Sequence, residues 1–245
     1  MSPTAQTVVI TGASRGLGRG CALAFAASGA EVLLVARNVE QLEAVAAEIR
    51  DKGGSVRTIA GDVTRAEVVR EVFSDLERCD VLINNAGANR PQPFLEVDLA
   101  TLDELLALNV RSMFVTAQAA ARVMARTRSG VIINMSSQMG HVGAVNRTVY
   151  CMTKHAVEGL TKAMAVELGP LGIRVNAVAP TYIETPMTQP FLASAAFRGE
   201  VLQKIPLGRI GTIDEVVAAV TFLASPAASL ITGASLLADG GYTAQ

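Results

Sequence analysis

The amino-acid sequence predicts an α/β fold in which helices cover both faces of a doubly wound parallel sheet of about seven strands. Two observations predict this class. Short apolar runs alternate along the chain with longer segments of helical periodicity, as expected when helices join parallel strands. Most of the short runs lack strict alternation of apolar and polar residues, which indicates strands that are buried on both faces.

Each expected element has its own signal in the chain. The apolar runs of strand length are TVVI (7–10), EVLLVA (31–36), SVRTIA (55–60), DVLIN (80–84), GVIINM (130–135), IRVNAVA (173–179) and SLLAD (235–239). Apolar residues at helical spacing fill the intervals, at 17–28, 39–52, 65–77, 101–126, 148–168 and 213–224. Because no repeat or linker interrupts the alternation, residues 1–245 are expected to form one domain.

One interval, residues 181–205, is expected to be irregular. It lies between the sixth and seventh strands and is interrupted by Pro186 and Pro190, with Pro206 directly after it. Long insertions of this kind often serve a function, so this segment is the predicted substrate lid.

The composition excludes several classes of protein. Half of the 245 residues are hydrophobic, the formal net charge is −1, and no basic block occurs, so nucleic acid is not an expected partner. Three dispersed cysteines without a CxxC motif favour a reducing compartment, and the two histidines make no metal site with them. The opening segment MSPTAQTVVITGAS lacks leader features, and no run of about 18 apolar residues occurs. We therefore expect no membrane span and a cytoplasmic location.

A glycine-rich turn, TGASRGLGRG, follows the first expected strand. Gly12, Gly16 and Gly18 stand where the strand passes into a helix, with Ser14 and Leu17 between them. Glycines here permit a tight turn and let a pyrophosphate approach the helix N-terminus, as in Rossmann-type domains. The spacing is G-x-x-x-G-x-G rather than G-x-G-x-x-G, and an ordinary strand-to-helix turn is the alternative. The position after the first strand favours a dinucleotide site.

The end of the second strand indicates which dinucleotide to expect. An acidic residue there would bind the ribose 2′-hydroxyl, whereas an arginine suits a 2′-phosphate. The strand ends in Ala36 and Arg37, and Arg15 of the glycine turn could reach the same place. We expect NADP(H) in preference to NAD(H), the alternative being two solvated arginines. Asp62, beside the Val63 amide, is placed to bind the adenine or to begin a helix.

A tyrosine and a lysine one helical turn apart form the next candidate site. In TVYCMTKHAVEGL, Tyr150 and Lys154 leave the same face of an expected helix. A cation about 5 Å from a phenol is worth roughly 3 kcal/mol at an effective dielectric of about 20. That would lower the phenol pKa enough for proton transfer near neutral pH. The alternative is an ordinary surface pair.

Five motifs in order resemble the short-chain dehydrogenase/reductase (SDR) family. They are the glycine turn, NNAG (84–87), LNV (108–110), INMSS (133–137) and Tyr150-x-x-x-Lys154. The resemblance extends from the first strand to DGG (239–241). It implies an NAD(P)-dependent oxidoreductase that interconverts a carbonyl and a secondary alcohol by hydride transfer.

The resemblance implies roles for single residues. Tyr150 is expected to be the general acid/base, and Lys154 to lower its pKa and hold the nicotinamide ribose. Ser137 is expected to polarise the carbonyl, with Ser136 as the neighbour to exclude. Asn109 is expected to anchor a water of a proton relay, or merely to satisfy a buried backbone group.

Further cofactor contacts follow from the same resemblance. Asn84, Ala86 and Gly87 are expected to form a wall beside the adenosine. Ile183 and Thr185 are expected to contact the carboxamide.

In one place the chain departs from the family pattern. Many members have glycine after proline where this chain has Pro180 followed by Thr181. The glycine lets the backbone pass close to the nicotinamide, so Thr181 is expected to reshape that floor.

Apolar helices indicate association of several chains. Val157, Met164 and Leu168 would be exposed on the helix at 148–168 in a monomer. The helix at 101–126 is similarly rich in Leu105, Leu108, Met113, Phe114 and Val115. Since SDR proteins often assemble through these helices, a homotetramer is predicted, with a dimer as the second choice.

The substrate is expected to be small and polar. The expected lining of its pocket is Asn89, Gln138, His141, Asn146, Tyr182 and Met187, with His141 either a substrate donor or a solvent-facing turn residue. The chain resembles oxidoreductases of sugar acids and polyols, such as gluconate 5-dehydrogenases.

Two alternatives remain open. The first is a 3-oxoacyl-[acyl-carrier-protein] reductase, for which Arg126 and Arg128 could bind the carrier, although Leu171 stands where such reductases often have a basic residue. The second is a non-catalytic NADP-binding regulator, which the presence of both Tyr150 and Lys154 argues against.

Overall fold

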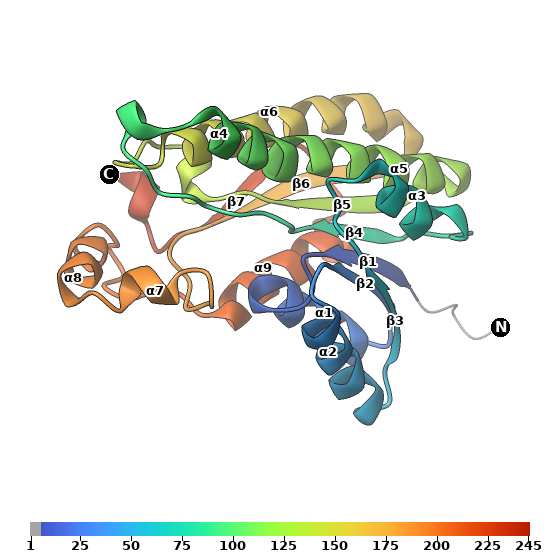
Figure 1. Ribbon diagram of the computed structural model, residues 1–245. Helices are drawn as coiled ribbons and strands as arrows, with labels where there is room; N and C mark the ends of the chain where they lie inside the picture. Colours follow the sequence, from blue (N-terminus) through green and yellow to red (C-terminus); the bar gives the residue numbers. More distant parts are fainter. Residues whose placement is uncertain (1–5) are drawn as a thin grey trace.

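Seven parallel strands form one sheet at the centre of the molecule, as the computed structural model, which describes residues 6–245, shows (Figure 1). Their spatial order is β3-β2-β1-β4-β5-β6-β7. The strands are β1 (Thr7–Thr11), β2 (Glu31–Ala36), β3 (Ser55–Ala60), β4 (Val81–Asn84), β5 (Gly130–Met135), β6 (Ile173–Pro180) and β7 (Ser235–Ala238). The predicted fold class is confirmed. The order of the strands reverses between β1 and β4, and ligands of such sheets bind at the carboxyl ends of the strands beside that point.

Helices cover both faces of this sheet (Figure 1). One face carries α1 (Gly16–Ala27), α2 (Val39–Asp51) and α9 (Ile213–Ala224). The other carries α3 (Ala66–Ser74), α4 (Leu99–Leu106), α5 (Ser112–Thr127) and α6 (Thr148–Leu168). In β1, Val8 and Ile10 pack into the first layer and Val9 into the second, and all three are fully buried. Burial on both faces explains why the strand sequences do not alternate.

The segment expected to form one helix at 101–126 is divided. It consists of α4, a π-helical turn at Ala107–Arg111, and α5. Asn109 lies in this turn, and its side chain bonds the backbone of Ala88 on a neighbouring loop. Single π-turns frequently mark functional sites, because the extra residue redirects a side chain out of the regular helix.

The expected lid is not wholly irregular. Two short helices, α7 (Gln189–Leu192) and α8 (Ala195–Gln203), occupy it and project beyond the carboxyl ends of the strands (Figure 1). Leu192 of α7 and Val201 of α8 pack with Ile205 and Ile210 in a small cluster separate from the two main layers. The prolines that suggested irregularity stand outside helix interiors, since Pro190 is in the first turn of α7.

Short single turns complete the described chain. They are 3₁₀ helices at Phe94–Glu96, Gln138–Gly140, Gly169–Leu171, Pro226–Ala228 and Tyr242–Ala244. Within residues 6–245, no helix combines the length and apolar character needed to cross a bilayer. The first five residues of the opening segment, from which the absence of a leader was expected, lie outside the described residues.

The structure corrects the residues on which association was predicted. Val157 is fully buried, and Met164 and Leu168 pack against the core instead of lying exposed. The apolar side chains that α5 and α6 leave exposed are Phe114, Met152 and Val166. Helical spacing located the helix correctly but could not distinguish its inner face from its outer face, because both are apolar.

Candidate active site

A cleft opens at the carboxyl ends of β1, β2 and β4. Its lining includes eleven of the residues predicted to bind the cofactor, namely Gly12, Ser14, Arg15, Gly16, Leu17, Arg37, Asp62, Val63, Ala86, Gly87 and Thr185. It also includes Asn85 and Leu108, which stand in the NNAG and LNV motifs without an assigned role, and Asn38 and Gln41, which no motif indicated. The cleft therefore joins the glycine turn, the end of β2 and the loop after β4 in one concave surface.

The glycine turn has the tight geometry that its sequence predicts. Gly12 has φ +65°, and a Cβ placed there would lie 2.9 Å from Asn85 Nδ2. A Cβ on Gly18 would lie 2.3 Å from the carbonyl oxygen of Gly12. Asn85 Nδ2 donates to the carbonyls of Thr11 and Gly12 at 3.0 and 3.2 Å. Side chains at these glycines would fill the turn, and Asn85 stabilises it.

A basic residue stands in the cleft lining at the end of β2. Arg37 follows β2 directly, and 68% of its side chain is exposed. Its guanidinium lies 4.0 Å from a carboxylate oxygen of Asp62. The other oxygen of Asp62 accepts from the amide and hydroxyl of Thr64 at 2.9 and 2.8 Å. The exposed guanidinium is thus free to bind an anion in the cleft, while Asp62 is held in place.

Six predicted cofactor residues lie outside this lining. They are Gly18, Asn84, Tyr150, Lys154, Pro180 and Ile183.

For Asn84 the expected wall contact is corrected, because its side chain points into the fold. It is 2% exposed and donates to the carbonyl of Met113 at 2.8 Å. Asn85 occupies the wall in its place.

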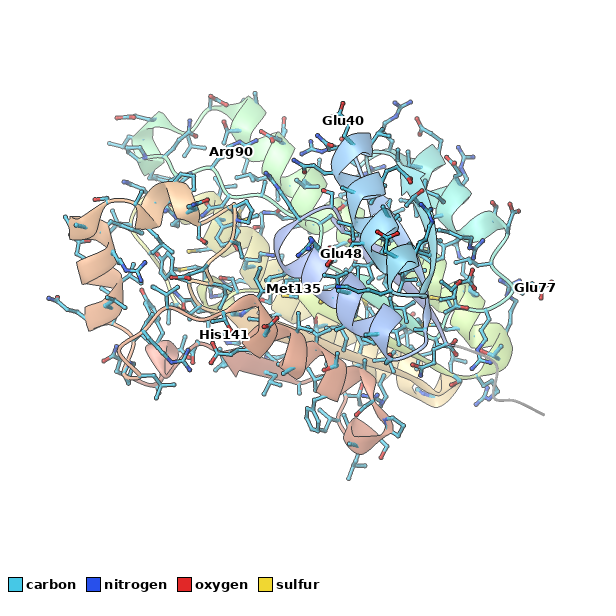
Figure 2. All side chains as sticks on the ribbon, turned by 90° about the horizontal axis from the view of Figure 1, so that it is seen from below. Glu40, Glu48, Glu77, Arg90, Met135 and His141 are labelled. Atoms are coloured by element: carbon cyan, nitrogen blue, oxygen red, sulfur yellow. The ribbon has the colours of Figure 1, made fainter. Side chains whose placement is uncertain are left out.

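Tyr150 and Lys154 are close together on α6. The Lys154 Nζ atom lies 5.6 Å from the centroid of the Tyr150 ring. Nζ donates a hydrogen bond of 2.7 Å to the carbonyl oxygen of Met135 at the end of β5. Figure 2 shows Met135 near the middle of the molecule, whereas Glu77 projects from its rim. Lys154 is only 4% exposed, so its charge lies inside the protein.

Burial shifts the pKa values of both Tyr150 and Lys154. It raises the pKa of Tyr150 to about 12, against the hydrogen bond with Ser137 and the charge of Arg147, which lower it. It lowers the pKa of Lys154 to about 8, against the charge of Glu158, which raises it. The expected lowering of the phenol pKa is therefore not found in this structure, because loss of hydration outweighs the hydrogen bond with Ser137 and the charge of Arg147.

Ser137 and Asn109 flank this pair. Ser137 follows β5, begins the 3₁₀ turn Gln138–Gly140, and accepts a hydrogen bond of 3.2 Å from the Met139 amide. Asn109 is fully buried, accepts from the Ala88 amide and donates to the Ala88 carbonyl, both at 2.9 Å, and donates to Thr153 at 3.1 Å. These bonds satisfy buried backbone groups, which was the alternative reading of Asn109.

A second cavity lies beside Tyr150. Four residues predicted at the substrate line it, namely Asn89, Gln138, Tyr182 and Met187, together with Ser137. Arg147, Met139, Thr181, Thr188 and Phe191 complete the lining. The cavity thus places a phenol and a serine hydroxyl beside amide and hydroxyl groups, in a lining that also contains apolar side chains.

The structure places His141 and Asn146 outside this lining. His141 Nε2 lies 3.0 Å from Ser235 Oγ and 3.3 Å from the buried carboxylate of Glu158, so it links the turn after Ser137 to α6 and β7. Asn146 is exposed, has φ +59°, and its carbonyl accepts from the Gln92 amide at 3.1 Å. These contacts are structural, and the expected contact of both residues with substrate stays a prediction.

Sequence reasoning did not identify Arg147, which lines the cavity and lies three residues before Tyr150. An arginine near the start of a helix has no distinctive pattern, since most arginines in such positions are solvated. Only its burial, 9% exposed, distinguishes it, and burial is not visible in a single sequence.

Comparison with known proteins agrees with this geometry. The sequence profile of the family described as Enoyl-(Acyl carrier protein) reductase matches residues 12–243. The chain is 39% identical over 240 residues to L-xylulose reductase of Bos taurus, covering 98% of this chain and 97% of the relative. It is 37% identical over 239 residues to gluconate 5-dehydrogenase of Gluconobacter oxydans (strain 621H), covering 96% and 93%.

A solved structure is similar along the whole chain. The crystal structure of a gluconate 5-dehydrogenase from Burkholderia cenocepacia J2315, in complex with NADP and tartrate, superposes with a TM-score of 0.94 at 34% identity. The alignment covers 98% of this chain and 96% of that one.

Proposed function

The chain belongs to the short-chain dehydrogenase/reductase family, and from that premise we propose that it is an NADP(H)-dependent oxidoreductase of small hydroxylated substrates. Family membership makes it an enzyme that acts on CH–OH and carbonyl groups with a nicotinamide cofactor. One observation carries the proposal. Tyr150, Lys154 and Ser137 converge at the carboxyl end of the sheet, where one cavity adjoins the cleft lined by the glycine turn.

The catalytic roles follow from this arrangement. In the reducing direction the nicotinamide, when bound, supplies a hydride to the carbonyl carbon. Tyr150 would transfer its phenolic proton to the carbonyl oxygen, and Ser137 would donate a hydrogen bond to that oxygen as its negative charge develops. Lys154, held by the Met135 carbonyl, would stabilise the phenolate left behind. The hydride and the phenolic proton together convert the ketone to a secondary alcohol. A proton from water then restores the phenol of Tyr150.

The cofactor preference rests on residues of the cleft. No acidic residue ends β2, and the exposed guanidinium of Arg37 stands there with Arg15 across the cleft lining. The two cations suit a 2′-phosphate. The glycine turn is tight, because a Cβ at Gly12 or Gly18 would collide with Asn85 or with the Gly12 carbonyl oxygen. A tight turn of this kind lets a pyrophosphate approach the backbone at the helix N-terminus. The residues therefore fit NADP(H), with NAD(H) as the alternative.

The substrate class is a sugar acid, polyol or small keto compound. The relatives named L-xylulose reductase and gluconate 5-dehydrogenase support it, as do the polar side chains of Asn89, Gln138 and Arg147 in the cavity lining. The second candidate is a 3-oxoacyl-[acyl-carrier-protein] substrate, favoured by the description of the family profile. Within one chain, however, Arg126 and Arg128 lie before β5, at the edge of the sheet opposite to Ser137.

A panel assay separates these substrates. NADPH oxidation is measured with ketoses, sugar keto acids, diketones and a 3-oxoacyl thioester at equal concentration. The proposal predicts turnover with a hydroxylated ketone that exceeds turnover with the thioester. A strong preference for the thioester would establish the second candidate, and no turnover with any carbonyl would refute the proposed activity.

The assembly and location complete the proposal. Exposed Phe114, Met152 and Val166 on α5 and α6 support a homotetramer, with a dimer as the alternative, and sedimentation would decide between them. The three cysteines are free and buried, which supports a reducing, cytoplasmic compartment.

A further inference from the structure

Arg147 is a buried cation without an anionic partner. It is 9% exposed and stands before the first residue of α6. Its guanidinium donates one hydrogen bond, of 3.3 Å, to the carbonyl of Asn146 and lies 5.2 Å from the centroid of the Phe191 ring. None of the ion pairs found within residues 6–245 includes Arg147. Most of its five N–H donors are thus left for another acceptor.

Such an arrangement is costly unless something else binds there. Buried arginines are nearly always paired, because removing a charge from water without a partner is unfavourable. The contact with the Phe191 ring offsets only part of that cost. Phe191 lies on α7, so the guanidinium also links the start of the catalytic helix to the lid.

Unpaired polar atoms surround the same cavity. Gln138 Oε1, Asn89 Oδ1 and Thr181 Oγ1 are buried, and none has a hydrogen-bond partner within the part of the chain that the structure describes. All three residues line the cavity with Arg147 and Tyr150. Gln138 is 1% exposed, so bulk solvent does not supply a partner for its oxygen. Buried oxygens of this kind require donors, and the hydroxyl groups of a substrate supply them.

We propose that Arg147 determines substrate specificity by binding the carboxylate of a hydroxylated keto acid, so that this enzyme acts on sugar acids in preference to neutral ketoses. The inference rests on the proposed function and specifies its substrate class. A carboxylate matches the planar donor pattern of a guanidinium and can accept two parallel hydrogen bonds. The cavity presents Tyr150 and Ser137 for the ketone, Arg147 for the acid, and three unpaired oxygens for the hydroxyls between them.

A matched pair of ketones tests the proposal. 5-Keto-D-gluconate and L-sorbose share a carbon chain and hydroxyl configuration, but one ends in a carboxylate where the other has a hydroxymethyl group. Wild-type enzyme with NADPH should favour the keto acid at least tenfold in kcat/KM. Arg147→Met should lower kcat/KM roughly 10- to 100-fold more for the keto acid than for L-sorbose, chiefly by raising KM. Arg147→Lys, which keeps the charge but not the planar donors, should lie between.

The matched control is Arg122→Met, which removes an exposed arginine of α5 and should leave the ratio of the two substrates unchanged. A wild-type preference for L-sorbose, or an equal loss for both ketones in Arg147→Met, would overturn the proposal. Retention of the melting temperature in Arg147→Lys separates loss of the anion site from loss of folding.

A binding measurement separates this inference from the proposed activity. D-Gluconate and D-glucitol are the corresponding alcohols, which cannot be reduced in the presence of NADPH. Calorimetric titration of the NADPH-loaded protein should give at least tenfold tighter binding of D-gluconate, and Arg147→Met should abolish the difference. Equal binding would refute the role of Arg147. Absence of turnover with every ketone, with tight gluconate binding retained, would instead refute the proposed activity alone.

Discussion

The Nζ atom of Lys154 lies 5.6 Å from the centroid of the Tyr150 ring, and about one helical turn beyond each member of this pair stands a charged residue that shifts its pKa. Glu158, one turn beyond Lys154 on α6, raises the pKa of Lys154 against the lowering by burial. Arg147, one turn before Tyr150, lowers the pKa of the phenol against the raising by burial. The pKa values of Tyr150 and Lys154 therefore depend on Arg147, which directly precedes α6, and on Glu158 within it.

The pH dependence of reduction follows from this relationship. The phenol remains protonated over the physiological range, because its pKa is raised to about 12. Lys154 loses its charge as the pH rises through about 8. We expect kcat/KM for ketone reduction to be constant below that pH and to fall by up to about tenfold per pH unit above it. A pH–rate profile at saturating NADPH measures this fall, which is the alkaline limb of the profile. A flat profile to pH 10 would contradict the prediction.

Glu158→Gln should move the alkaline limb of the kcat/KM profile to lower pH. The substitution keeps the shape of the side chain but removes the negative charge that raises the pKa of Lys154. The buried carboxylate also contacts His141 Nε2 at 3.3 Å and Ser235 at 3.1 Å, and glutamine can keep both contacts. Glu167→Gln, on the exposed side of the same helix, is the control and should not move the limb. Identical profiles for the two variants would show that Glu158 does not act on Lys154.

The nucleotide preference depends on the end of β2. Arg37→Asp should raise KM for NADPH by roughly 10- to 100-fold, because it replaces the cation for a 2′-phosphate with an anion. KM for NADH should change far less. Initial rates with both nucleotides measure this, and Arg122→Asp on α5 controls for the change in net charge. Equal losses for NADPH and NADH would contradict the assignment of Arg37.

The close packing of the glycine turn makes a prediction about stability. Gly18→Ala should lower the free energy of unfolding by about 1–3 kcal/mol, because its Cβ would lie 2.3 Å from the Gly12 carbonyl oxygen. Gly159→Ala in α6 is the matched control, since nothing lies within 4 Å of a Cβ there. It should be neutral or raise that free energy by about 0.5–1 kcal/mol. Urea denaturation of both variants measures the difference, and equal free energies of unfolding for the two variants would show that the turn accepts a side chain at Gly18.

The sheet was predictable because burial on both faces leaves a clear pattern. A continuous apolar run such as the one at 130–135 predicts a buried strand without knowledge of the neighbouring strands. The structure confirms it, since β5 spans Gly130–Met135. The division of 101–126 was not predictable. Its π-helical turn is held by bonds from Asn109 to Ala88, a contact between segments 21 residues apart that no local propensity reveals.

The site was predictable where a motif fixes the residue and not where burial decides its chemistry. The motifs indicated Ser137 and Tyr150, and both residues line one cavity in the structure. They did not predict that the phenol pKa is raised, because desolvation depends on the packing of the whole fold. They also missed Arg147 and misplaced His141, since only the tertiary structure shows which side of a turn faces the cavity.

The role of Tyr150 as proton donor is tested most directly by comparing wild type with Tyr150→Phe in NADPH-dependent reduction of the best ketone from the panel. Removing one hydroxyl should lower kcat by about 10²- to 10⁴-fold. NADPH affinity, followed by nucleotide fluorescence, should stay within about threefold, because the phenol contributes no charge to the cleft. A Tyr150→Phe variant that turns over at the wild-type rate would contradict the account.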